Sequence, residues 1–151
     1  MSVEVNTYKT YLAMIENSAG TRMFRNVYAS VDGEEQEILR DGELACAYFV
    51  SGVLRMFDLC NEMHVTVRRL LRDMESSGWI QRKDPPPGAV VYWKERTYDD
   101  GEQHEHIGFL VGDEEAVSTD YRKCEVVRHP LTELNGKREV KAVYWHPKLG
   151  E

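Results

Sequence analysis

The sequence is poor in cysteine and has no long apolar run. No stretch approaches the ~20 consecutive apolar residues that a membrane-spanning helix needs, so we expect no membrane contact. Only Cys46, Cys60 and Cys124 are present, an odd number without a Cys-x-x-Cys pair. This argues against a disulfide framework and indicates reduced thiols. The first eight residues also lack the basic and then apolar pattern of a secretion signal, so we expect a cytoplasmic protein.

Positive charge is also in short supply. Lysine and arginine number 19 against 26 aspartates and glutamates, which gives a net charge of -7. An acidic chain is a poor match for a phosphate backbone, so we do not expect nucleic acid as a partner. A length of 151 residues with 42% apolar and 30% charged residues is typical of one globular domain. We expect this domain to span residues 1–151, with residues 1–35 as an N-terminal helical extension packed on it.

The hydrophobic period changes from helical to extended along the chain. Spacing of three and four predicts helices over 6–17, 42–57 and 65–77. From Gly88 onward the period is two, and it predicts strands over 89–93, 106–111, 116–119, 126–127 and 140–145. We expect a polar loop over 97–103 and a hairpin turn over 112–115. Residues 21–29 are ambiguous. Helices first and strands second indicate an α+β fold with an antiparallel sheet.

The most apolar stretch of the chain begins just after Asp41. Asp41 is a good N-cap and Glu43 suits the positive end of a helix dipole, so we expect a buried helix over 42–57 with Cys46 in its first turns. Free amides at a helix start favour a thiolate, which would make Cys46 a nucleophile. The competing interpretation is that Cys46 only packs in the core, as buried cysteines usually do.

A thiol nucleophile needs a histidine to move its proton. Among the five histidines, His106 alone combines a strand position with a glycine two residues later, which leaves room beside its ring. The alternative is an ordinary surface histidine. His104 and His106 share a strand face and could form the edge of a metal site, but no third ligand is evident. We therefore expect neither a metal nor another cofactor.

Three segments in this order resemble a known family. They are Cys46 opening a buried helix, then Pro-Gly-Ala-Val-Val-Tyr-Trp over 87–93, then His-Ile-Gly-Phe-Leu-Val-Gly-Asp over 106–113 followed by a hairpin. The pattern is similar to that of the NlpC-type papain-like bacterial cell-wall peptidases over roughly residues 40 to 120. The resemblance implies a papain-like fold in which His106 on the sheet faces Cys46. It also implies a cysteine peptidase or amidase acting on peptides derived from peptidoglycan.

The resemblance also implies a third residue that orients His106. Ser118 falls near that position, and we expect it opposite His106 across the hairpin turn over 112–115. Asp120, on the same strand face, competes with it. The backbone amide of Cys46 would stabilise the oxyanion. In the family a tyrosine upstream of the cysteine assists, and Tyr28 is the nearest substitute here.

Two other functions remain open. Residues 64–93 resemble a winged helix, in which five basic side chains would meet DNA phosphates: Arg68, Arg69, Arg72, Arg82 and Lys83. The triple proline over 85–87 and the acidic chain oppose this. The second alternative is a papain-like domain that binds a peptide or partner without catalysis. It is kept open by the alanines on both sides of Cys46, where the family has aspartate before the cysteine and serine or glycine after it.

Overall fold

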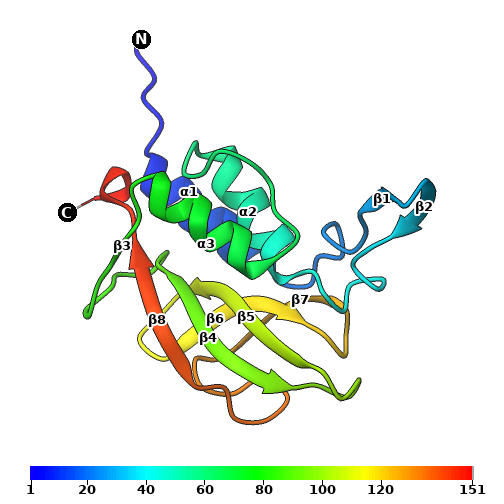
Figure 1. Ribbon diagram of the computed structural model, residues 1–151. Helices are drawn as coiled ribbons and strands as arrows, with labels where there is room; N and C mark the ends of the chain where they lie inside the picture. Colours follow the sequence, from blue (N-terminus) through cyan, green and yellow to red (C-terminus); the bar gives the residue numbers. More distant parts are fainter. Residues whose placement is uncertain (151) are drawn as a thin grey trace.

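Three helices cover one face of an antiparallel sheet. A computed structural model describes residues 1–150 and places α1 (Thr7–Asn17), α2 (Cys46–Met56) and α3 (Val67–Ser76) together above this face (Figure 1). The sheet has six strands in the order β3-β8-β4-β5-β6-β7. Their bounds are β3 Ile80–Gln81, β4 Val90–Thr97, β5 Gln103–Leu110, β6 Glu115–Asp120, β7 Glu125–Pro130 and β8 Val140–Trp145. The α+β fold class and its antiparallel sheet are thus confirmed.

Helix α2 lies at the centre of the core, as its composition predicts. Its residues from Phe49 to Leu54 are all buried. The Phe49 ring packs edge-to-face on the ring of Phe109 in β5, with ring centroids 5.5 Å apart. Such edge-to-face pairs add to the stabilisation from burial itself. The helix therefore attaches directly to the strand that carries His106, and this attachment positions the site described below.

The predicted start of the central helix is wrong by four residues. Arg40, Asp41 and Gly42 all have positive φ, at 50°, 56° and 102°, so a right-handed helix cannot begin there. Asp41 does not cap the helix; its carboxylate accepts from Arg25 Nε at 2.8 Å. Glu43 consequently lies before the helix. The helix starts at Cys46, and its N-cap is Ala45, which offers no side-chain acceptor.

The N-terminal segment is only partly helical. Helix α1 is capped by Asn6, and its Tyr11 hydroxyl donates to the Gly88 carbonyl at 2.7 Å, which ties it to the start of β4. The chain then forms a hairpin of β1 (Tyr28–Val31) and β2 (Glu34–Glu37) that projects from the body (Figure 1). The expectation of a helical extension through residue 35 is therefore wrong for this hairpin, where the Asp-Gly turn favours two paired strands.

The strands after Gly88 follow the period-two pattern, with two differences. Strand β4 continues to Thr97 and β5 starts at Gln103, so the expected loop over 97–103 is shortened to the turn between them. In the β5–β6 hairpin Phe109 is opposite Val117, a register two residues from the predicted one. Continuing this register places Ser118 beside Gly108 instead of directly opposite His106.

The segment after α3 does not form a winged helix. A wing requires the strand that follows the helix to pair with the next strand in a hairpin. Here β3 pairs with β8, at the far end of the chain, through Ile80 opposite Trp145. The basic side chains of α3 are exposed, but the DNA-binding module they would serve is not assembled. Across residues 1–150, the structure contains no helix that is both long and apolar enough to cross a bilayer.

Candidate active site

Cys46 lies where α2 begins against strand β5. Backbone amides of Ile107 and Ala47 point to its sulfur, so the thiol sits directly beside the residue that follows His106. The first amides of a helix have no partner within the helix, and Ala45 supplies no side-chain cap to occupy them. The sulfur and its surroundings thus have free backbone donors, as an anion-stabilising site requires.

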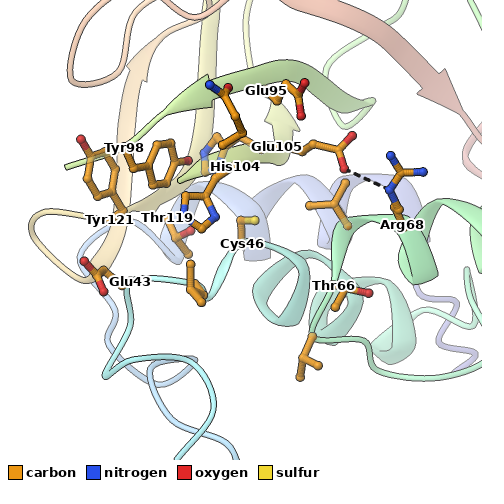
Figure 2. A pocket seen from close by; sticks show the side chains of 15 residues that line it. Glu43, Cys46, Thr66, Arg68, Glu95, Tyr98, His104, Glu105, Thr119 and Tyr121 are labelled. Carbon is orange, nitrogen blue, oxygen red and sulfur yellow. Dashed lines mark ion pairs between the residues drawn. The ribbon is translucent and has the colours of Figure 1, made fainter. Parts of the chain in front are cut away.

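A pocket of about 390 Å³ opens over this point, and both Cys46 and His106 line it. Figure 2 shows Cys46 near the middle of the lining. On one side of it lie aromatic side chains, namely Tyr98, Tyr121 and His104. On the other side lie the polar side chains of Thr66 and Arg68. The predicted nucleophile and base therefore share a cavity that can admit a ligand.

His106 is the first member of a buried chain of hydrogen bonds. Its Nε2 lies 2.9 Å from Ser118 Oγ, and the same oxygen lies 2.6 Å from Nε2 of His129. His129 Nδ1 is in turn 2.7 Å from the carbonyl of Pro130 and 3.1 Å from that of Glu133. Because Nε2 of His106 is bound to Ser118, Nδ1 is the nitrogen that remains for the thiol.

Gly108 makes this contact possible. A Cβ added to Gly108 would lie 2.6 Å from Ser118 Cβ and 2.8 Å from the Val117 carbonyl, distances that real side chains do not tolerate. The glycine therefore lets β6 approach β5 closely enough for Ser118, which lies diagonally two residues along the strand, to reach the His106 ring. The room that the glycine was expected to leave beside the His106 ring is thus present, and Ser118 and the Val117 carbonyl approach there.

The site is arranged for neutral partners at rest. Burial raises the pKa of the Cys46 thiol, and the surrounding amides offset this only in part. Burial, with the positive charge of Arg138, holds the pKa of His106 well below its usual range. A neutral thiol and a neutral imidazole in one pocket follow, because each charged form would lose its hydration.

A buried arginine stands behind the pocket. Arg138 is 2% exposed, and its only side-chain hydrogen bond runs from Nη1 to the hydroxyl of Tyr98 at 3.1 Å. Its Nε and Nη2 have no hydrogen-bond partner within residues 1–150. Tyr98 itself lines the pocket and stacks on Tyr121 with ring centres 4.0 Å apart. Since Tyr98 accepts from Arg138, its own O–H is left to donate elsewhere.

Two predicted site residues lie away from His106. Asp120 accepts from Asn135 Nδ2 at 2.9 Å and from the Arg122 amide at 2.8 Å, so its carboxylate stabilises the turn after β6 and does not orient the imidazole. Tyr28 is 68% exposed on the projecting hairpin and is not part of the pocket lining. Of the two candidates for the third residue, only Ser118 contacts His106.

Three residues of the site were not singled out from sequence: His129, Arg138 and Tyr98. For His129 a signal exists, because Ser118 is opposite Val127 in the β6–β7 hairpin and side chains two apart share a face. A strand over 125–130 would therefore have placed His129 next to Ser118. Arg138 lies between β7 and β8, and nothing in its local sequence marks it as buried.

The His104–His106 metal edge is not formed. His104 Nε2 lies 2.7 Å from Asp100, whereas His106 faces Ser118. Asp100, Glu102 and His104 do gather their ligand atoms within 4.8 Å of one another. Both carboxylates, however, are paired with Arg40, at 2.7 Å and 3.3 Å, so a cation of the chain already balances part of the charge of the cluster.

The chain matches no protein-family model and no curated protein. The function proposed below is therefore inferred from the geometry and chemistry of the pocket residues.

Proposed function

We propose that this chain is a papain-like cysteine hydrolase that cleaves an amide bond, with Cys46 as nucleophile and His106 as base. One observation carries the proposal: a cysteine at the amino end of a buried helix shares a pocket with a histidine whose Nε2 is held by Ser118. A helix-borne cysteine packed on a histidine-bearing antiparallel sheet is also the arrangement that the NlpC-type resemblance implies.

In acylation the Cys46 thiol proton passes to Nδ1 of His106 as the sulfur attacks the amide carbon. The sulfur electron pair forms a bond to the amide carbon, and the π pair of the carbonyl moves onto its oxygen. Free amides at the start of α2 stabilise that negative charge, because they are directed at the site before the reaction starts. The C–N bond then breaks, and the leaving amine takes the proton from His106.

Deacylation repeats these steps with water. His106 removes a proton from the water as its oxygen attacks the thioester, and collapse of the second oxyanion breaks the C–S bond. The departing sulfur recovers the proton from His106, so one water is consumed and the site returns to its neutral resting state. No metal or organic cofactor is required by this sequence of steps.

The pocket lining supports a peptide as substrate. Glu43, Glu95 and Glu105 contribute acidic groups, and Arg68 lies 3.7 Å from Glu105 at the rim. Mixed charges of this kind suit a polar peptide with both ammonium and carboxylate groups better than an apolar ligand. A peptide fragment of peptidoglycan, which the resemblance implies, has this chemistry.

The second candidate function is non-catalytic peptide binding. It is favoured by the burial that raises the pKa of Cys46, because a thiol that stays protonated is a weak nucleophile unless a base assists it. The two functions differ in one observable, the formation of a thioester on Cys46.

The test combines turnover with thiol mapping. Wild-type protein and Cys46→Ala are incubated with γ-glutamyl and muropeptide-like amides, and intact mass is recorded after acid quench. We expect turnover and an acyl adduct that Cys46→Ala abolishes and that Cys124→Ala, outside the pocket, retains. Iodoacetamide should label Cys46 faster than Cys60, whose pKa burial raises to about 11. No turnover, no adduct and equal labelling rates at all three thiols would leave the binding function.

A further inference from the structure

The strongest feature outside the Cys46–His106 pair is the hydrogen-bond chain that runs from His106 into the sheet. It contains two imidazoles and one hydroxyl, and no carboxylate forms a hydrogen bond to either ring within residues 1–150. Ser118 is fully buried and His129 is 7% exposed. A group this deep cannot touch a substrate, so its influence on the reaction has to pass through His106.

The far end of the chain determines the position of every proton in it. Both partners of His129 Nδ1 are backbone carbonyls, which only accept, so Nδ1 carries a hydrogen. Burial lowers the pKa of His129, which leaves the ring neutral and makes its Nε2 an acceptor. The Ser118 hydroxyl must then donate to His129, and its oxygen accepts from Nε2–H of His106. His106 is consequently left with an unprotonated Nδ1, the nitrogen that the proposed mechanism uses as base.

We propose that His129 is a positioning residue that sets the tautomer of His106 through Ser118, and that protonation of His129 turns the base off. The proposal rests on the hydrolase function above and deepens it. During acylation only one proton moves, onto Nδ1 of His106, and no hydrogen bond behind the ring has to change. The serine is thus the middle of the orienting device, and the histidine on β7 is its anchor.

Protonation of His129 reverses the direction of the chain. Its Nε2–H would donate to Ser118 Oγ, and the Ser118 hydroxyl would have to turn toward Nε2 of His106, since residues 1–150 offer that hydroxyl no other hydrogen bond. The His106 hydrogen then moves to Nδ1, and a protonated Nδ1 can no longer accept the proton of the thiol. In the alternative arrangement His106 keeps its Nε2 hydrogen, and the buried Ser118 hydroxyl hydrogen has no acceptor. This arrangement is disfavoured, because leaving a buried hydrogen bond unmade costs free energy.

The charges around His129 come from several elements. Asp120 of β6 favours the protonated ring, and Arg138, before β8, opposes it. The Trp93 ring of β4 lies 5.7 Å away and His106 of β5 adds no charge while it is neutral. Burial dominates these effects and lowers the pKa. Activity should therefore be constant through neutral pH and fall on the acid side, below about pH 6.5, the ordinary histidine value.

The experiment reads the tautomer directly. Long-range ¹H–¹⁵N spectra of imidazole-labelled wild-type protein at pH 7.5 should show His106 with hydrogen on Nε2 and His129 with hydrogen on Nδ1. Acidification should protonate His129 and shift the His106 hydrogen to Nδ1 in the same transition. A His106 that carries its hydrogen on Nδ1 at pH 7.5, or that keeps its tautomer while His129 titrates, would overturn the proposal without any substrate.

Kinetics supply the second arm. His129→Phe removes the acceptor, so His106 should adopt the Nδ1–H tautomer and kcat/KM should fall by about 10²-fold or more, as expected for a wrong tautomer. In the Ser118→Ala background the same change should have almost no further effect, because coupled residues are not additive. His146→Phe removes a buried histidine that bonds the Ser77 carbonyl instead, and should leave the His106 tautomer unchanged.

The two arms separate this proposal from the hydrolase function. The predicted tautomers without turnover on any amide would retain the relay and reject the hydrolase. Turnover together with additive effects of His129→Phe and Ser118→Ala would retain the hydrolase and reject the relay. Should His129→Phe fail to fold, the wild-type titration alone decides the outcome.

Discussion

Replacing Arg138 with methionine should make the protein more stable and its thiol less reactive toward anions. The guanidinium is 2% exposed, and two of its nitrogens have no partner within the described chain. Each buried unpaired donor costs about 1–3 kcal/mol, whereas the single bond to Tyr98 contributes about 1 kcal/mol. Methionine has a similar length and no polar atoms to desolvate. We therefore expect the free energy of unfolding to rise by about 1–3 kcal/mol, or Tm by about 3–8 °C for a chain of this size.

The reactivity of Cys46 should change in the opposite direction. A fixed positive charge beside the thiol attracts an anionic reagent and favours the thiolate. The ratio of the iodoacetate to the iodoacetamide rate at Cys46 measures that field, because the two reagents differ mainly in charge. We expect Arg138→Met to lower the ratio about fivefold. Arg96→Met is the matched control, since its guanidinium also lies over the Tyr98 ring, at 5.9 Å, but is only half-buried.

The direction of the change in stability, taken together with the change in the iodoacetate-to-iodoacetamide ratio, distinguishes two roles for Arg138. A structural role alone predicts a less stable variant with an unchanged reagent ratio. A gain in stability together with a lower ratio is expected only if the cation is retained for its charge at the cost of stability. An unchanged ratio in Arg138→Met, or an equal fall in Arg96→Met, would refute the reasoning.

Three further changes have definite expected outcomes. Tyr98→Phe removes the hydroxyl held by Arg138. Because this O–H would stabilise the oxyanion, steady-state assays should show kcat lower by about tenfold or more with little change in KM. Gly108→Ala should destabilise the protein by about 2 kcal/mol or more in urea titration, since its Cβ would overlap Ser118. Asp73 accepts from the backbone amides of Asn61 and Glu62. It also bonds His64 Nε2 at 2.7 Å and accepts from the Ser77 hydroxyl. Together these bonds outweigh burial and lower the pKa of Asp73 to about 2. This depressed pKa gives about 2 kcal/mol of stability above about pH 4, which is lost as pH falls toward 2 and is absent in Asp73→Asn.

Much of the fold could be predicted because each element has a local cause. Strand β8 begins and ends where the alternation of residues 140–145 indicates, and α2 is buried as its composition requires. The predicted helix start after Asp41 is wrong because of a contact with a residue distant in sequence. Arg25 competes for the carboxylate and the positive φ values bend the chain, and neither effect is visible in the pattern of one helix.

The site was predictable only where strand geometry alone places a side chain. His106 and Ser118 follow from alternation and one hairpin, and the two-residue error in register did not separate them because Gly108 admits the diagonal contact. Tyr98 and Arg138 come together across the β4–β5 turn and the segment before β8. That contact joins residues 40 positions apart, and no periodicity encodes it.

The charge balance of the buried cluster indicates how the proposed reaction would differ from one that starts with an ion pair. Arg138 is a permanent cation, and it lowers the pKa of both His106 and His129. An imidazolium next to it is disfavoured, whereas negative charge on Cys46 or on a substrate oxygen is favoured. A preformed thiolate–imidazolium pair would gain from Arg138 at one member and lose at the other. The neutral pair avoids that loss before the reaction starts. In the transition state the loss at His106 is offset by attraction between Arg138 and the negative charge that develops on the substrate oxygen. Proton transfer to His106 is therefore best coupled to attack on the carbonyl, and the His129 relay keeps Nδ1 unprotonated until that moment.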